Sequence, residues 1–280
     1  MRINELHDRL YEMLKIVDGI CKNHHIQYWM HGGSAIGAVR EHDFIPWDDD
    51  MDILILAEDY PRFCEAMKYL PEHYHLIEPY DFSPFFYDYV IRICDDRWRL
   101  RPETKEDKVY RNYQNSVCID VFLLSYCPEK GLKQKTWFLK YDILYGMAMK
   151  YRHSIDYSKY SFTQICQVAT LRVLGGLFSK NDPNRIIRKW EQFALSSDAT
   201  RTRMVSNTLI HCYWQPMPDA WFKDTVYVKF RDMEVPVQKE YDKVLSLTFG
   251  NYMVPERDTN KYLTHLNKED LLPEDMERIL

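Results

Sequence analysis

The chain has 280 residues, of which 46% are hydrophobic and 28% charged, so its composition is that of a globular protein and not of a disordered one. Its formal net charge of -5 excludes a broadly basic nucleic-acid-binding protein, and we expect no nucleic-acid partner. The seven cysteines are scattered without a CxxC pair, which predicts free thiols in a reducing compartment.

The first eight residues carry charges where a signal peptide would have an apolar segment. No uninterrupted apolar run approaches the ~20 residues that cross a bilayer. We therefore expect a cytoplasmic protein, located at the inner face of the membrane if it contacts lipid.

The N-terminal part predicts a helix, a strand and a glycine turn. Apolar residues recur at three- and four-residue spacing over 6–21, which is typical of a helix with one buried face. The run 26–30 predicts a short strand that ends at Gly32-Gly33-Ser34. We expect Ser34 to cap a short helix over 35–40.

The following part alternates strands and helices before it becomes helical. Strands are predicted at 53–56, 74–77, 87–94 and 117–124, with a helix over 58–70. The pattern is helical over 130–180 and again from Asp182-Pro183 to Phe193. Strands over 225–230 and 234–237 then precede a helix over 241–249, which Gly250 is placed to cap.

This order predicts an α+β fold with a mixed sheet, flanking helices and a helical insertion or appendage. We expect one catalytic domain over 1–280. Its core is predicted at about 20–127, its helical segment at about 128–199 and its completing region at about 200–280.

Four acids occupy the positions just before the apolar run 53–56. Alternate side chains of an extended segment share a face, so Asp50 and Asp52 are expected to point one way, with Asp48 at the same parity. Neighbouring carboxylates repel, and a divalent cation such as Mg²⁺ relieves that repulsion. For an isolated acidic triplet a solvated turn is the simpler interpretation, but the strand that follows favours a metal site.

Asp120 is the single acid of the apolar run 117–124. A buried acid is costly unless it is paired or bound to metal. We consider a third carboxylate of the same site, acting as metal ligand or base, and a core Asp bonded to the backbone or to an Arg.

Several residues near the acids are candidates for phosphate or nucleotide binding. Gly33 and Ser34 allow close backbone approach to a phosphate, although a plain turn explains them equally well. Arg40 is suited to clamp a diphosphate or to pair with Glu41 or Asp43. Trp47 is suited to stack on a base or to fill the core, and Arg92 lies on a strand that reaches the site.

Two motifs together resemble the LicD family of the polymerase-beta-like nucleotidyltransferase superfamily, which is related to the fukutin group. They are the stretch His31 to Arg40 and the stretch Phe44 to Ile53, in which fifteen residues separate Ser34 from Asp50. The run 119–122 resembles the later acidic strand of the family, and 235–237 with 249–253 resembles its C-terminal region.

The resemblance implies Mg²⁺-dependent transfer of a phospho-alcohol such as phosphocholine, with Mn²⁺ as an alternative ion. The donor would be a CDP-activated alcohol, and the acceptor a hydroxyl of a glycan or lipid-linked glycan of lipopolysaccharide, teichoic acid or capsule. Asp50, Asp52 and Asp120 would hold metal, and Asp120 or Asp48 would take the acceptor's proton. Gly33, Ser34 and Arg40 would hold the diphosphate.

This chain departs from the family pattern in two places, and two other functions stay open. Ser34-Ala35 replaces an expected Thr-Leu, and Gln238 stands where a second Pro is common. One alternative is a nucleotidyltransferase that moves NMP from an NTP to a small molecule. The other is a non-catalytic relative that binds a nucleotide or glycan.

The segment 130–152 has six basic residues, one acid and interleaved aromatic residues. Such a helix is suited to peripheral contact with an anionic membrane. The alternative is a solvated helix face over a packed aromatic stripe.

Overall fold

We describe the fold from a computed structural model, which describes residues 1–86, 89–151, 157–195, 204–207 and 216–255. The chain divides into two compact units. Unit 1 comprises Met1–Ile77, Ile91–Leu124 and Met217–Leu280, and unit 2 comprises Glu78–Val90 and Ser125–Pro216.

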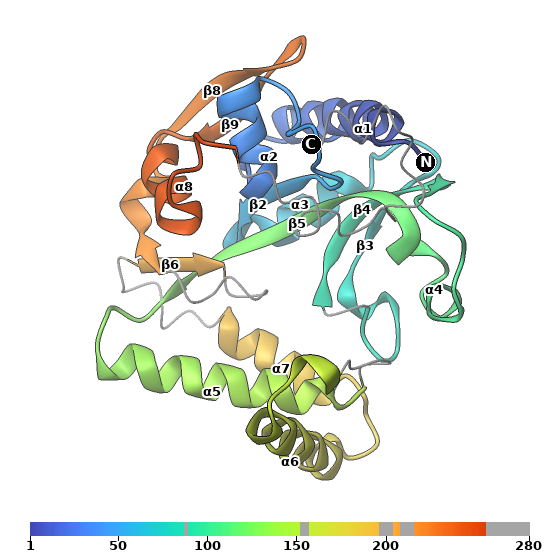
Figure 1. The fold of residues 1–280 in the computed structure, drawn as a ribbon, viewed down its shortest axis with the longest axis vertical. Helices are drawn as coiled ribbons and strands as arrows, with labels where there is room; N and C mark the ends of the chain where they lie inside the picture. The colour runs from blue at the N-terminus through green and yellow to red at the C-terminus, as the bar shows by residue number, and fades with distance from the viewer. Residues whose placement is uncertain (87–88, 152–156, 196–203, 208–215, 256–280) are drawn as a thin grey trace. The chain divides into compact units, whose positions relative to one another are not determined.

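Unit 1 is built on a mixed sheet with the strand order β1-β2-β5-β4-β3 (Figure 1). The β2–β5 pair is parallel, and the β1–β2, β5–β4 and β4–β3 pairs are antiparallel. The strands are β1 (Tyr28–Met30), β2 (Asp52–Leu56), β3 (Tyr74–Ile77), β4 (Ile91–Arg99) and β5 (Ser116–Cys127). This arrangement confirms the expected α+β fold with a mixed sheet and flanking helices.

The register of the central strands brings three charged residues into one row. Asp52 at the start of β2 lies opposite Asp120 of β5, and Asp120 lies opposite Arg92 of β4. Directly opposite residues on neighbouring strands point to the same face of a sheet. The fold therefore places two acids and one guanidinium together from segments far apart in sequence.

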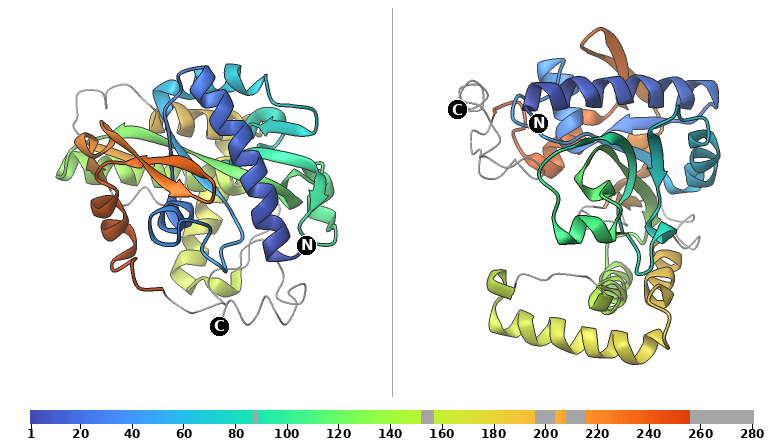
Figure 2. Two further views of the ribbon diagram at one scale, coloured as in Figure 1. Left: turned by 90° about the horizontal axis from the view of Figure 1, so that it is seen from above. Right: turned by 90° about the vertical axis from the view of Figure 1, so that its right-hand side faces the viewer.

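Helix α1 (Ile3–Asn23) runs across one face of this sheet (Figure 2). Its buried side chains repeat every three or four residues, as the sequence predicts, and include Leu6, Leu10, Leu14 and Val17. Other helices in the described part of unit 1 are α2 (Gly32–Ile36), the π-helical turn η1 (Gly37–Glu41), α3 (Tyr60–Met67) and α4 (Lys105–Val109), with short 3-10 helices at Ala57–Asp59 and Tyr113–Asn115.

The C-terminal part of unit 1 returns to its N-terminal part. Strands β8 (Thr225–Phe230) and β9 (Met233–Gln238) form an antiparallel pair, and α8 (Tyr241–Phe249) follows, with Gly250 at its C-cap. The indole N–H of Trp29 donates to Thr225 Oγ1 over 2.9 Å. Arg231 pairs with Asp43 and with Asp8 of α1. The hairpin is therefore joined to α1 and to the segment that precedes the acids Asp48 to Asp52.

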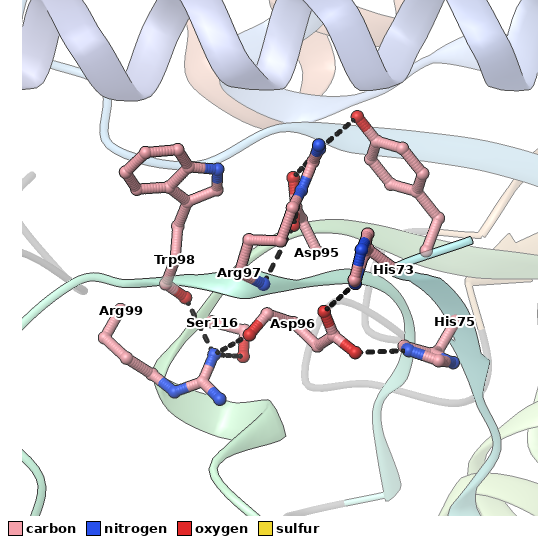
Figure 3. A network of polar contacts seen from close by, with 9 residues as sticks. His73, His75, Asp95, Asp96, Arg97, Trp98, Arg99 and Ser116 are labelled. Carbon is pink, nitrogen blue, oxygen red and sulfur yellow. Dashed lines mark hydrogen bonds and ion pairs between the residues drawn. The ribbon is translucent and has the colours of Figure 1, made fainter. Parts of the chain in front are cut away.

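A polar network covers the β3–β4 edge of the sheet (Figure 3). The carboxylate of Asp96 bonds to His73 Nδ1 at 3.1 Å and to His75 Nε2 at 2.8 Å. Arg97 pairs with Asp95 at 2.6 Å. These charged side chains occupy an edge of the sheet, where they oppose pairing with another sheet.

The α-helices in the described part of unit 2 are α5 (Leu132–Ala148), α6 (Phe162–Ser179) and α7 (Arg185–Ala194) (Figure 1). Helix α5 packs against both α6 and α7. Trp137 stacks on Phe193 with ring centroids 5.0 Å apart, and Tyr141 lies 5.3 Å from Trp190. The aromatic stripe that the sequence places on the segment 130–152 is therefore packed within unit 2. Arg152, the last residue of that segment, lies outside the described residues.

The other described strands are the short β6 (Met204–Asn207) and β7 (Met217–Pro218). Within the described residues, no helix combines the length and the apolar character that a membrane span requires. Cysteines 21, 64, 94, 118, 127 and 166 are free thiols, as predicted, and Cys212 lies outside the described residues.

Two local predictions differ from the structure. The strand predicted over 87–94 begins at Ile91, and 87–88 lie outside the described residues. Ser34 does not cap a helix, because α2 begins at Gly32 with His31 as its N-cap. The helix therefore begins at Gly32, which has a left-handed backbone, three residues earlier than the capping pattern suggests.

Candidate active site

The glycine turn, Gly32-Gly33-Ser34, lies directly against the acidic segment Asp48 to Asp52. Gly32 has a φ of +54°, a conformation that favours glycine, and a Cβ there would come within 3.0 Å of Asp52 Oδ2. A Cβ on Gly33 would collide with Asp48 Oδ2. The carboxylates of Asp48 and Asp52 therefore sit on the backbone of the turn, in space that only glycine leaves open.

Ser34 joins α2 to the first residue of β2. Its hydroxyl oxygen accepts a hydrogen bond from the Asp52 N–H over 2.9 Å, and the residue is buried. The His31 N–H donates to the Asp52 carbonyl over 3.0 Å. Asp52 is thus fixed through both of its backbone polar groups, which orients its side chain toward the turn.

The acids repel one another in a poorly solvated environment. Burial, followed by the charge of Asp50, raises the pKa of Asp48 well above its usual value, and the same two causes, in that order, raise the pKa of Asp52. Asp120 adds to the repulsion on Asp52. The side chains of Met51 and Ile53 are fully buried. The predicted division into acids on one side and core on the other is confirmed, although only Asp52 of the acids lies in the strand.

Asp120 is paired with Arg92 through one hydrogen bond and one ion-pair contact. Arg92 Nε lies 2.7 Å from Asp120 Oδ1, and Nη2 donates to Oδ2 over 3.0 Å. Burial alone would lower the pKa of Arg92, but the charge of Asp120 raises it above its usual value. Arg92 therefore reaches the acidic cluster, as predicted, but as the partner of Asp120, the alternative considered for a lone buried acid.

Arg40 pairs with a neighbouring acid and a C-terminal carbonyl, and Trp47 lies in a turn. Arg40 Nε pairs with Glu41 at 2.7 Å, the alternative considered for this residue, and Nη1 donates to the carbonyl of Tyr252. Trp47 is half-buried in a turn that the Asp48 N–H closes on the Ile45 carbonyl at 3.0 Å. Arg40 thus links the first motif to the C-terminal region.

Two side chains beside the acids are not among the residues that the sequence predicts for the site. The His31 ring lies 4.8 Å from the Phe122 ring, and burial lowers its pKa to about 4, so it is neutral at pH 7. The Cys118 Sγ lies 3.8 Å from Asp120 Oδ1. Its position two residues before Asp120 on a strand is the sequence signal that identifies it.

Two of the acids fit the requirements of a divalent cation. Across the described ranges, no group of three or more His, Cys, Asp or Glu side chains is placed to hold a metal ion. Asp50 and Asp52 are nevertheless close oxygen donors whose mutual repulsion a cation would relieve. Mg²⁺ is commonly held by one or two carboxylates together with substrate phosphates, so these two acids fit that role.

We expect Gly33→Ala to lower activity at least about tenfold and to destabilise the fold by about 1–3 kcal/mol, because its Cβ overlaps the Asp48 carboxylate. Turnover assays and thermal unfolding measure the two effects. Gly19→Ala is the matched control, since a Cβ at Gly19 meets no atom within 4 Å. Wild-type behaviour of Gly33→Ala would contradict this account of the turn.

Residues 25–157 match the family model described as LicD/FKTN/FKRP, nucleotidyltransferase domain. This segment is a LicD-family domain. The family resemblance of the two motifs is thereby confirmed. All nine residues that the sequence predicts for the site lie within this LicD-family domain, namely Gly33, Ser34, Arg40, Trp47, Asp48, Asp50, Asp52, Arg92 and Asp120.

The chain is also similar to two named proteins. The chain is 24% identical over 262 residues to Lipopolysaccharide cholinephosphotransferase LicD of Haemophilus influenzae, covering 88% of this chain and 91% of that protein. It is 41% identical over 59 residues to Ribitol 5-phosphate transferase FKRP of Homo sapiens, covering 21% of this chain and 12% of that protein. The similarity to the first relative thus extends through both compact units.

Proposed function

We propose that this chain is a cytoplasmic transferase that moves a phospho-alcohol from a CDP-activated donor to a hydroxyl of a cell-surface glycan or its precursor. The observation that carries the proposal is the group of Asp48, Asp50, Asp52 and Asp120 against a glycine turn, inside a LicD-family domain. The names of both relatives describe transfer of a phosphorylated alcohol.

Asp50 and Asp52 would hold Mg²⁺, or Mn²⁺ in its place, and Asp120 lies beside them in register with Asp52. When bound, the ion supplies positive charge that stabilises the donor diphosphate and the transferred phosphoryl group. Mg²⁺ is commonly bound by one or two carboxylates together with substrate phosphates, so Asp50 and Asp52 would supply the protein's share of its ligands.

The protein's own groups position the reactants. The turn at Gly32 and Gly33 brings the backbone against the carboxylates of Asp48 and Asp52 and so fixes where these two acids lie. The ion pair and the hydrogen bond from Arg92 hold the Asp120 carboxylate in place on the strand beside Asp52. Positioning and electrostatic stabilisation are the main protein contributions to phosphoryl transfer.

The transfer forms one bond and breaks one. The acceptor hydroxyl oxygen bonds to the β-phosphorus of the donor, the phosphoanhydride bond breaks, and CMP leaves with the bonding electrons. The hydroxyl proton passes to a carboxylate, and Asp48 and Asp120 are the two candidates. Arg92 occupies both oxygens of Asp120, whereas the carboxylate of Asp48 faces the glycine turn.

Product analysis with Mg²⁺ and each donor in turn tests the proposal. We expect CMP release from one of CDP-choline, CDP-glycerol or CDP-ribitol in the presence of a glycan acceptor, and loss of that release with EDTA. Pyrophosphate release from an NTP would instead assign the chain to nucleotidyl transfer. Retention of full turnover after removal of all divalent cations would overturn the metal assignment.

A further inference from the structure

Helix α6 carries a continuous apolar stripe on its exposed side. Phe162, Val173 and Leu177 are 80%, 64% and 71% exposed. Cys166 and Ala169 are exposed between them, so the five positions follow the three- and four-residue spacing of one helix face. The whole helix from Phe162 to Ser179 contains one charged residue, Arg172.

The opposite side of α6 accounts for its packing within unit 2. A Cβ at Gly175 would collide with the Met147 carbonyl, and a Cβ at Gly146 would come 2.5 Å from Leu171 Cδ1. These glycines let α5 and α6 approach each other closely. The exposed stripe is therefore a second apolar face, which the packing of α6 on α5 does not use.

Lys150, Arg172 and Lys180 flank this second face, in a basic part of the sequence. Residues 130–189 contain twelve Lys and Arg against three Asp, although the whole chain has a net charge of -5. Lys150 Nζ lies beside the stripe, 2.5 Å from the position that a Cβ on Gly176 would occupy. Arg172 is half-buried on the flank of the stripe, and Lys180 is exposed at its end.

We propose that the exposed face of α6 lies in the interfacial layer of an anionic lipid bilayer, with the surrounding Lys and Arg on the headgroups. An amphipathic helix with one apolar face and basic residues nearby binds such surfaces by burying apolar side chains and attracting anionic lipids. The aromatic residues of α5, which the sequence suggests for this contact, are packed instead on α7.

Charge favours a lipid surface over a second copy of this chain. A symmetric contact through α6 would bring together two segments that each carry twelve basic residues against three acids. Like charges placed against each other oppose association. An anionic bilayer offers the complementary charge together with an apolar layer.

Co-sedimentation of the full chain with vesicles tests this proposal without any donor or acceptor, so its outcome is independent of the proposed function. We expect binding to vesicles of about 70% phosphatidylcholine and 30% phosphatidylglycerol, and at least about tenfold weaker binding to phosphatidylcholine alone. Raising NaCl from about 0.1 to 0.5 M should reduce the binding several-fold.

Val173→Asp combined with Leu177→Asp should weaken vesicle binding at least about tenfold and leave the melting temperature unchanged. Val254→Asp is the matched control, because Val254 is 59% exposed and lies in unit 1. Equal binding by the double variant and wild type would overturn the proposal. Absence of vesicle binding would do the same, as would a dimer in light scattering that the double variant abolishes.

Discussion

Asp52→Asn is expected to reduce turnover by at least about 10³-fold while the fold is retained. Asp52 is the first residue of β2, and both its backbone N–H and its carbonyl are bonded to the segment that carries the glycine turn. Asn keeps the size of the side chain and removes the charge that would hold a cation. CMP release under saturating Mg²⁺ measures the loss.

The same substitution should not destabilise the metal-free protein. The pKa of Asp52 is raised in the folded state, so its proton is bound more tightly there than in the unfolded chain. Its contribution to stability therefore falls as pH rises above the unfolded pKa of about 4. Because Asn carries no charge, we expect Asp52→Asn to melt at or above the wild-type temperature at pH 7 in EDTA, and to lose this advantage at pH 4.

An exposed acid supplies the matched control for both measurements. Asp224 has a side chain that is 72% exposed and pairs with Lys239 at the surface. Asp224→Asn should leave turnover and melting temperature within error of wild type. Wild-type turnover of Asp52→Asn would remove Asp52 from the mechanism, and its unfolding would show that the carboxylate has a structural role.

The elements with a strong local pattern are those that the sequence predicts well. The buried face of α1, strand β3 and helix α8 follow periodicity and caps, which depend on neighbours within one or two turns. Strand β4 is displaced at its start. Tyr89 lies inside the predicted strand 87–94, yet it has a φ of +67° and donates its N–H to the Phe86 carbonyl in a turn.

The site was predictable to the extent that it is local. Asp50 and Asp52 stand out because charged residues lead directly into an apolar strand. The partner of Asp120 was not predictable, because the register between β4 and β5 depends on the whole sheet and a one-residue shift would turn Arg92 to the other face. The exposed stripe of α6 was not predictable for a similar reason, since apolar composition alone does not distinguish a buried helix face from a free one.

Arg92→Gln is expected to destabilise the fold by about 3–5 kcal/mol, the usual cost of leaving one member of a buried ion pair without its partner. Arg92 has a side chain that is 4% exposed, and that of Asp120 is 13% exposed. Urea unfolding measures the change. Arg188→Gln is the control, because the side chains of Arg188 and its partner Asp182 are 48% and 44% exposed, and we expect it to cost about 1 kcal/mol or less.

The double variant Arg92→Gln with Asp120→Asn separates pairing from chemistry. Removing both charges should cost less than the two single substitutions together, by about 1–3 kcal/mol, because neither charge is then buried alone. We expect the double variant to lose turnover, since the amide that replaces the Asp120 carboxylate neither binds a metal ion nor takes up a proton as the carboxylate does. Additive free energies would show that the two residues do not act as a pair. Wild-type turnover in the double variant would show that Asp120 serves only to neutralise Arg92. The reaction would then depend on Asp48, Asp50 and Asp52.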